Sequence, residues 1–239
     1  MGRLFQRLLN KAQKISFASQ ALLLKMKKET PCFLDSKKVM IVPNAIDLKS
    51  FDEKTDSFAL PSGKQYIFSC GRFVFDKGFD ILLKAWGKLA SAYPGIDLLI
   101  AGDGEERTHL ESLAASLGLS ERVSFLGVIL PQRLISYYRG CLFFISPSRF
   151  EPFGNVVLEA MAASKAVIGS GRGGTAEVIK DGFNGLLFES GNDQMLAEKM
   201  KGLIENRGDR DLLGINARRF VEQNYTPDIF SARIEKLIA

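Results

Sequence analysis

From residue 65 onward, short apolar runs alternate with longer segments in which apolar side chains recur every three or four positions. The runs have the length of buried strands, and the segments between them have the pattern of amphipathic helices. A strand–helix–strand repeat places helices on both faces of a parallel sheet. We therefore expect an α/β fold, a Rossmann-like parallel sheet of about six strands with helices on both faces. The expected strands are 66–70, 97–101, 122–126, 141–145, 166–168 and 185–188.

Helices are expected between these strands and in the segment before them. Those after residue 65 should cover 77–92, 105–117, 131–139 and 155–163, with three more starting near residues 192, 209 and 227. Thr175 is placed to cap a short helix that holds Glu177. Before residue 65 the pattern predicts a helix, a short strand within 14–19, a helix to about residue 28, a strand at 38–41 and a polar loop at 49–64.

The composition excludes several classes of protein. Of 239 residues, 46% are hydrophobic and 25% charged, which is typical of a globular domain and excludes disorder, collagen and coiled coil. The three cysteines, Cys32, Cys70 and Cys141, are scattered and predict buried thiols in a reducing, cytoplasmic compartment. A single histidine, His109, excludes a multi-histidine metal site and argues against a Ser-His-Asp triad; we expect it on the surface.

The positive charge is concentrated at the N-terminus. Residues 1–30 contain seven Lys and Arg side chains and one acidic one, which accounts for more than the whole net charge of +5. The rest of the chain therefore gives no support for nucleic-acid binding. No run approaches the ~18 apolar residues that span a membrane. The basic segment is either a solvated helix face or a surface for a membrane or a partner.

Two cations follow the first expected strand of the sheet. Arg72 leaves that strand and Lys77 begins the next helix. Ligands of parallel sheets bind at the carboxyl ends of the strands, and helix N-termini attract anions. Arg72 and Lys77 therefore predict a phosphate or diphosphate site. The alternative is that Arg72 pairs on the surface with Asp76 or Asp80.

Two glutamates follow the fourth strand. Glu151 and Glu159 are eight residues apart, and Gly154 between them allows close backbone approach. A continuous helix would separate them by about 12 Å, too far for carboxylates that share a proton. They would instead accept hydrogen bonds from hydroxyls on two parts of one elongated ligand. Alternatively, Glu151 is a loop charge and Glu159 a helix-face carboxylate.

The motifs in these loops, taken in order, resemble the nucleotide-sugar-binding half of the retaining group 1 (family 4) glycosyltransferases of GT-B fold. They include GRFVFDKG at 71–78, AGDG at 101–104, VSFLG at 123–127, PSRFEPFG at 147–154, EAMA at 159–162, GG at 173–174, EVI at 177–179 and DGFNGLL at 181–187. The resemblance covers residues 38–239. Residues 43–47 resemble the interdomain linker of that family, and residues 11–28 the last strand and helix of its N-terminal domain.

The resemblance implies a role for each matching residue. Arg72 and Lys77 would hold the diphosphate and stabilise its charge as it leaves, Glu151 would hold sugar hydroxyls, and Glu159 would hold the ribose. The remaining donor-binding positions would be Gly71, Gly127, Val128, Phe153, Gly154 and Asn155, with Gly127 and Val128 against the base. The donor would be a UDP-, GDP- or ADP-sugar, with no cofactor. No metal is expected, because the one Asp-x-Asp sequence, at 209–211, lies in the C-terminal helices.

The resemblance also implies a division of the chain. Residues 1–43 would be the remnant of an acceptor domain plus linker, and residues 44–239 the donor domain. The expected function is transfer of a hexose, with retention, to an unknown sugar or lipid acceptor, with help from a missing N-terminal acceptor domain. The alternative is a non-catalytic nucleotide-sugar-binding subunit of a split enzyme. An NAD-dependent oxidoreductase would need a complete GxGxxG, which the GDG at 102–104 does not supply.

The N-terminal remnant would have an exposed apolar face. It carries Leu4, Phe5, Leu8 and Leu9 among its basic residues. Without a sheet of its own, it is expected to pair with another chain, a second copy or a membrane surface. The protein would then be cytoplasmic and could lie peripherally at a membrane.

Overall fold

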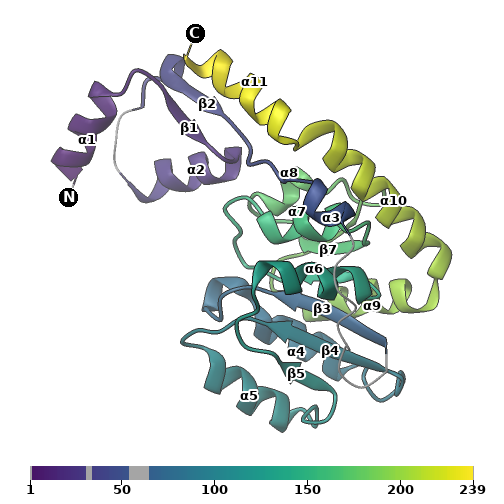
Figure 1. Cartoon of the computed structure of the whole chain (residues 1–239). Coiled ribbons are helices and arrows are strands. Elements are labelled where there is room, and N and C mark those ends of the chain that lie inside the picture. Colours follow the sequence, from purple (N-terminus) through teal and green to yellow (C-terminus); the bar gives the residue numbers. More distant parts are fainter. Residues whose placement is uncertain (1, 31–33, 54–64, 239) are drawn as a thin grey trace.

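The computed structural model describes residues 2–30, 34–53 and 65–238, and the side chains from residue 6 onward (Figure 1). Its centre is a six-stranded parallel sheet in the order β5-β4-β3-β6-β7-β8. The strands are β3 (Gln65–Cys70), β4 (Ile96–Ala101), β5 (Val123–Phe125), β6 (Phe144–Ser146), β7 (Val167–Ser170) and β8 (Leu186–Phe188). The chain builds outward from β3 to β5 and then returns to start β6 beside β3. This confirms the expected fold class and places the reversal of strand order between β3 and β6.

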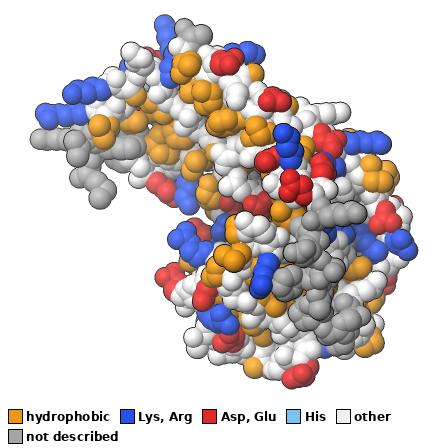
Figure 2. Space-filling model, viewed as in Figure 1, with side chains coloured by type: hydrophobic (Ala, Val, Ile, Leu, Met, Phe, Trp, Pro, Cys, Tyr) orange, Lys and Arg blue, Asp and Glu red, His pale blue; other side chains and the backbone are white. Residues whose placement is uncertain are grey.

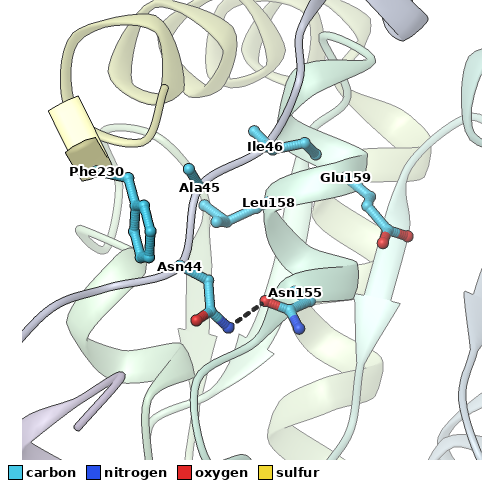
Figure 3. A pocket seen from close by; sticks show the side chains of 7 residues that line it. All are labelled: Asn44, Ala45, Ile46, Asn155, Leu158, Glu159 and Phe230. Carbon is cyan, nitrogen blue, oxygen red and sulfur yellow. Dashed lines mark hydrogen bonds between the residues drawn. The ribbon is translucent and has the colours of Figure 1, made fainter. Parts of the chain in front are cut away.

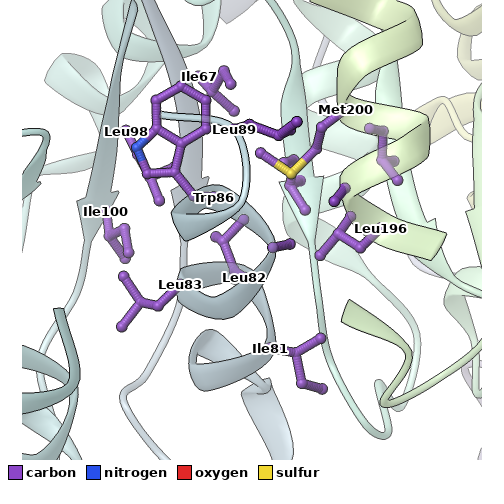
Figure 4. Packing of buried hydrophobic residues seen from close by; sticks show 14 of the residues in the cluster. Ile67, Ile81, Leu82, Leu83, Trp86, Leu89, Leu98, Ile100, Leu196 and Met200 are labelled. Atoms are coloured by element: carbon purple, nitrogen blue, oxygen red, sulfur yellow. The ribbon is translucent and has the colours of Figure 1, made fainter. Parts of the chain in front are cut away.

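Helices cover both faces of the sheet, as expected. They are α4 (Phe79–Gly87), α5 (Arg107–Ser116), α6 (Pro131–Gly140), α7 (Asn155–Ala162), α8 (Thr175–Val178), α9 (Asp193–Glu205), α10 (Arg207–Asn224) and α11 (Pro227–Ile238). Successive strand residues point to opposite faces, so Ile67 and Phe68 belong to two different cores. Figure 4 shows the first core, where Trp86 and Leu82 of α4 meet Met200 of α9.

The second core lies between the other face of the sheet and α6, α7 and α10. Tyr138, Val157 and Ala217 are fully buried there. Cys70 and Cys141 are buried free thiols, as expected, whereas Cys32 lies outside the described residues. His109 is exposed on α5, which was also expected.

Several expected element boundaries are wrong. Helix α4 starts at Phe79, because Phe75–Lys77 form a separate 3₁₀ turn that ends at the left-handed Gly78. It stops at Gly87 rather than near residue 92. Strand β6 starts three residues later than expected. Part of the expected loop at 49–64 is the short helix α3 (Lys49–Asp52), which buries Phe51; residues 54–64 lie outside the described part.

Thr175 does not cap the helix that holds Glu177. Gly174 is the N-cap residue, and Thr175 is the first residue of α8. The Thr175 side chain is fully buried, with its methyl group packed against the backbone of β7 at Gly169. Tertiary packing therefore directs the side chain into the core and away from the helix terminus.

Residues 2–41 form a small unit of their own. It contains α1 (Gly2–Lys11), β1 (Ile15–Phe17), α2 (Gln20–Glu29), a 3₁₀ turn (Ser36–Lys38) and β2 (Val39–Ile41). The expectation that this segment lacks a sheet is wrong, since β1 pairs in parallel with β2 of the same chain. Figure 1 shows α10 and α11 running back along the molecule, so that the C terminus lies beside this unit.

The surface of this unit keeps apolar side chains in contact with solvent. Leu8 of α1 and Leu24 of α2 are more than half exposed, and every residue of β2 is only half-buried. Hydrophobic side chains gather over the β1–β2 region in Figure 2. None of the helices in the described part of the chain combines the length and apolar character needed to cross a bilayer.

Candidate functional site

The loops that follow β3, β4 and β5 pack against one another at the carboxyl edge of the sheet. The Gly71 N–H donates to Ala101 O (3.0 Å), and the Gly102 N–H donates to Gly127 O (2.8 Å). A Cβ atom on Gly102 would lie 1.9 Å from Gly71 O, so this approach requires glycine. The packed backbones form the floor of an open cavity beside the point where the strand order reverses. In doubly wound sheets, that crevice is where ligands bind.

This cavity has a volume of about 400 Å³ and is lined by both polar and apolar side chains. The structure brings four sequence-predicted residues to it: Gly71, Arg72, Val128 and Glu159. Val128 is 80% exposed at its rim. An apolar wall with one cation, Arg72, and two carboxylates, Asp103 and Glu159, suits a ligand that has a flat, a charged and a hydroxylated part.

The Arg72 side chain is exposed and makes no hydrogen bond or ion pair with any other described residue. The alternative pairing with Asp80 does not occur, because Arg149 binds both oxygens of that carboxylate at 2.7 and 2.8 Å. Burial raises the pKa of Asp80, but the hydrogen bonds and charges of Arg149 and Lys84 together hold the pKa below its usual value. Arg72 thus presents a free guanidinium to the cavity.

Lys77 and Glu151 form a direct ion pair, with 2.5 Å between Nζ and Oε2. Lys77 lies in the 3₁₀ turn after β3, and Glu151 lies in the loop after β6, so the pair bridges the two central strands. Both side chains are largely buried. The sequence predicted both residues as parts of the site but did not predict their contact, because 74 positions separate them.

The backbone around Glu151 is fixed by the loop that follows β7. The Gly174 N–H donates to Glu151 O (2.6 Å). A Cβ atom on Gly173 would lie 2.4 Å from the same oxygen. The loop after β6 then continues through Phe153, which is buried, to Gly154, the N-cap residue of helix α7. Because α7 starts only at Asn155, the 12 Å helical spacing of the two glutamates does not apply.

Glu159 is held by a different partner from Glu151. The Tyr138 hydroxyl donates to Glu159 Oε2 (2.7 Å), and the same hydroxyl contacts Cys70 Sγ (3.0 Å). Burial raises the pKa of Glu159, and the hydrogen bond from Tyr138 partly opposes that rise. Sequence reasoning missed Tyr138, although a tyrosine on a buried helix face needs a partner for its hydroxyl.

A second cavity, of about 490 Å³, adjoins the first at Glu159 (Figure 3). It lies between α7, the linker after β2 and helix α11. The Asn44 side-chain amide donates to Asn155 Oδ1 (2.9 Å) across one wall, and Phe230 forms another. Neither Asn44 nor Phe230 was a predicted site residue, and the linker is adjacent to α7 only in three dimensions.

The N-terminal unit docks beside the Glu151 loop. The Ser19 hydroxyl donates to Pro152 O. The Gln20 and Ala21 N–H groups donate to the Glu177 carboxylate at 3.0 and 2.7 Å, so a residue of α8 caps the start of α2. Carboxylates stabilise helix N-termini in this way. No local pattern predicts this contact, because more than 150 positions separate its partners.

Replacing Glu177 with alanine should loosen this junction. We expect the amides of Gln20 and Ala21 to exchange hydrogen about tenfold faster, because each loses a charge-assisted hydrogen bond. Mass spectrometry of the peptide that contains them would measure the change. The exposed Glu111 on α5 provides the control substitution. Unchanged exchange would show that Glu177 does not hold α2.

Within the residues that the structure describes, no three His, Cys, Asp or Glu side chains are arranged to hold a metal ion. Of the four charged residues predicted for the site, Arg72 and Glu159 line the cavity, whereas Lys77 and Glu151 are not among its lining residues and pair with each other.

Comparison with known proteins places this chain in a family. Residues 50–220 match the sequence model of the family Glycosyl transferases group 1. An uncharacterized glycosyltransferase of Methanocaldococcus jannaschii is 32% identical over 200 residues, which cover 80% of this chain and 51% of the relative. This chain spans about half the length of the curated relatives it matches.

Solved structures agree with this assignment. The C-terminal domain of the group 1 glycosyl transferase LpcC from Francisella tularensis aligns with a TM-score of 0.68 and 28% identity, over 76% of this chain and 99% of that domain. Anabaena HepE, in complex with UDP and glucose, has the same fold over 99% of this chain and 66% of its own, with a TM-score of 0.85 and 23% identity. The six-stranded sheet and its helices are thus the C-terminal half of a GT-B fold, and the chain belongs to the group 1 glycosyltransferases.

Proposed function

We propose that residues 44–239 bind a nucleoside diphosphate sugar and form the donor half of a retaining hexosyltransferase. The observation that carries the proposal is the free guanidinium of Arg72, which shares a cavity with Glu159 beside the point where the strand order reverses. An unpaired cation at this edge of an α/β sheet suits a diphosphate.

In this proposal, each predicted residue contacts one part of the donor. The base lies against Gly127 and Val128, the ribose hydroxyls donate to Glu159, and the diphosphate binds Arg72 and Lys77, close to Gly71. The sugar hydroxyls donate to Glu151, with the backbone of Phe153–Asn155 alongside. Lys77 already contacts Glu151, so it lies where sugar and phosphate would join. Donors aimed at the leaving diphosphate stabilise the charge that develops there.

UDP is the first nucleotide to test, because HepE is described in complex with UDP-glucose. GDP and ADP should be tested next, since none of the described side chains in the cavity selects one base over another. The acceptor, a sugar or a lipid, would bind in a separate acceptor half. We propose that residues 1–30 contact another chain, with a second copy of this chain or a membrane surface as the alternatives, and that the protein works in the cytoplasm.

Calorimetric titration tests the donor site directly. The chain would be titrated with UDP, GDP and ADP, and with the glucose and mannose conjugates of each. Saturable binding of one nucleotide and its conjugate supports the proposal, and the absence of binding by all of them contradicts it. Hexose transfer after addition of a separate acceptor half would distinguish an enzyme from a non-catalytic subunit that binds nucleotide sugars.

Replacing Glu151 with alanine should affect the sugar conjugate more than the bare nucleotide. Loss of the hydroxyl acceptor should weaken binding of the conjugate about tenfold, because hydrogen bonds to charged groups are the stronger ones. Binding of the bare diphosphate should change little, since Lys77 then loses a competing partner. Calorimetry on both ligands measures this, with the exposed Glu121 as control site. Equal losses of affinity for the conjugate and the bare diphosphate would show that Glu151 does not contact the sugar.

A further inference from the structure

Behind the donor cavity, three polar side chains from three different elements form a continuous hydrogen-bonded chain. Cys70 ends β3, Tyr138 lies on α6 and Glu159 lies on α7. The distances are 3.0 Å from Cys70 Sγ to the Tyr138 hydroxyl and 2.7 Å from that hydroxyl to Glu159 Oε2. Tyr138 is fully buried, and Cys70 and Glu159 line the cavity wall.

The direction of the protons in this chain follows from the chemistry of the groups. An ionised carboxylate only accepts hydrogen bonds, so the single phenolic proton of Tyr138 goes to Glu159. The phenolic oxygen then accepts from the Cys70 thiol. Burial raises the pKa of Cys70 to about 12, and burial also raises that of Tyr138, so both groups keep their protons near neutral pH.

This arrangement leaves the two oxygens of Glu159 in different situations. Oε2 is occupied by Tyr138, whereas Oε1 has no hydrogen-bond partner among the described residues. Glu159 lines the donor cavity, the adjoining cavity of Asn44 and Phe230, and a third cavity that Tyr138 also lines, so the orientation of its carboxylate decides which of them Oε1 faces. A glutamate has three rotatable side-chain bonds, and a buried hydrogen bond removes much of that freedom.

We propose that Tyr138 is a positioning residue for Glu159, fixing its carboxylate so that Oε1 faces the ribose hydroxyls of the nucleotide. This inference rests on the proposed donor site. It adds a residue that does not touch the ligand but acts through one that does. The Cys70 thiol donates a hydrogen bond to the phenolic oxygen and so helps to hold the Tyr138 hydroxyl in place.

The same contact sets the pH range over which Glu159 can act. Burial raises the pKa of Glu159, and Tyr138 opposes that rise, so its removal should raise the pKa further. As the pH falls, the Glu159 carboxylate would then become protonated, and stop accepting hydrogen bonds from the ribose, at a higher pH than in the wild type. The other ionisable or charged groups on the adjoining walls are Arg72, Asp103 and Asp47. They remain in place in the variant.

Tyr138→Phe tests the inference, because it removes one oxygen and leaves the ring in the core. Tyr66→Phe is the matched control: Tyr66 is also a buried tyrosine, but its hydroxyl donates to Tyr137 O (2.9 Å), and it lines none of the cavities that contain Glu159. Both variants and the wild type would be titrated with UDP, GDP and ADP from pH 5 to 8. The diphosphate that binds would then be compared with its 2′,3′-dideoxy analogue.

We expect Tyr138→Phe to weaken binding of the ribose form about tenfold and of the dideoxy form much less. The pH at which affinity is half lost should move upward relative to both Tyr66→Phe and wild type. Protonation of the diphosphate ligand over this pH range affects all three proteins equally and therefore cancels in the comparison. Wild-type affinity in Tyr138→Phe, or equal losses for both analogues, would overturn the inference.

A second pair of variants keeps the test decisive if Tyr138→Phe is poorly folded. Glu159→Gln removes the charge but not the volume, and adding Tyr138→Phe to it should weaken binding little further, because both changes act on one contact. Additive losses would overturn the inference. If the wild type binds none of the three nucleotides, the proposed donor site is wrong. If the wild type binds and Tyr138→Phe binds equally well, only the positioning role of Tyr138 is wrong.

Discussion

Replacing Gly102 with alanine is expected to destabilise the fold by about 3–5 kcal/mol and to abolish nucleotide binding. The new Cβ atom would lie 1.9 Å from Gly71 O, and the backbone φ of +138° is one that side-chain-bearing residues rarely adopt. The two loops would have to separate. Because their backbones form the floor of the cavity, the cavity would then change shape. Urea unfolding would measure the loss of stability, and calorimetry the loss of binding.

Gly118→Ala separates the clash from the backbone strain. Gly118 also has a positive φ, of +71°, but no atom lies within 4 Å of its Cβ position. Its replacement should cost about 1 kcal/mol and leave binding intact. Similar losses at the two glycines would show that the close packing of the loops after β3 and β4 is not required.

Arg72→Ala is expected to weaken binding of both the nucleoside diphosphate and its sugar conjugate about 100-fold, or about 2.7 kcal/mol. The guanidinium has no other partner among the described residues, so the loss should appear in ligand affinity and not in stability. Arg72→Lys should recover part of the affinity, because it keeps the charge but not the planar fork. Calorimetry and thermal melting together measure both effects.

Arg207 supplies the control for Arg72, since its side chain is 84% exposed on α10. Arg207→Ala should bind nucleotide like the wild type. The Arg72 effect should also shrink as salt is added, because an exposed cation is screened. Unchanged affinity in Arg72→Ala would make Arg72 a solvated surface residue.

Much of the fold could be predicted because its signal is local. Each apolar run that became a strand of the sheet was visible in the sequence, and so was the alternation that sends Ile67 and Phe68 to opposite faces. Strand and helix boundaries were less accurate. Gly78 ends a 3₁₀ turn where a helix had been expected to start, because its backbone is left-handed and lies so close to the loop after β6 that a Cβ atom would be 2.3 Å from Pro147 O.

The candidate site was predictable in its parts but not in its contacts. Arg72 and Glu159 could be assigned to one edge of the sheet, because loops after parallel strands share that edge. The contacts of Lys77 with Glu151 and of Glu177 with α2 could not be predicted, since each joins residues far apart in sequence. Tyr138 was missed because a buried tyrosine in an amphipathic helix is indistinguishable from other core residues until its hydroxyl partner is known.

The sequence by itself therefore determined the fold class, the family and the loops in which charged side chains gather, because hydrophobic period and motif order are properties of consecutive residues. The tertiary structure alone decided which charges are paired and which are free. Lys77 is bound to Glu151, Asp80 is bound to Arg149, and the Arg72 side chain has no partner among the described residues and lines the cavity. Pairing depends on distances between side chains of different loops, and those distances exist only once the sheet has brought the loops together.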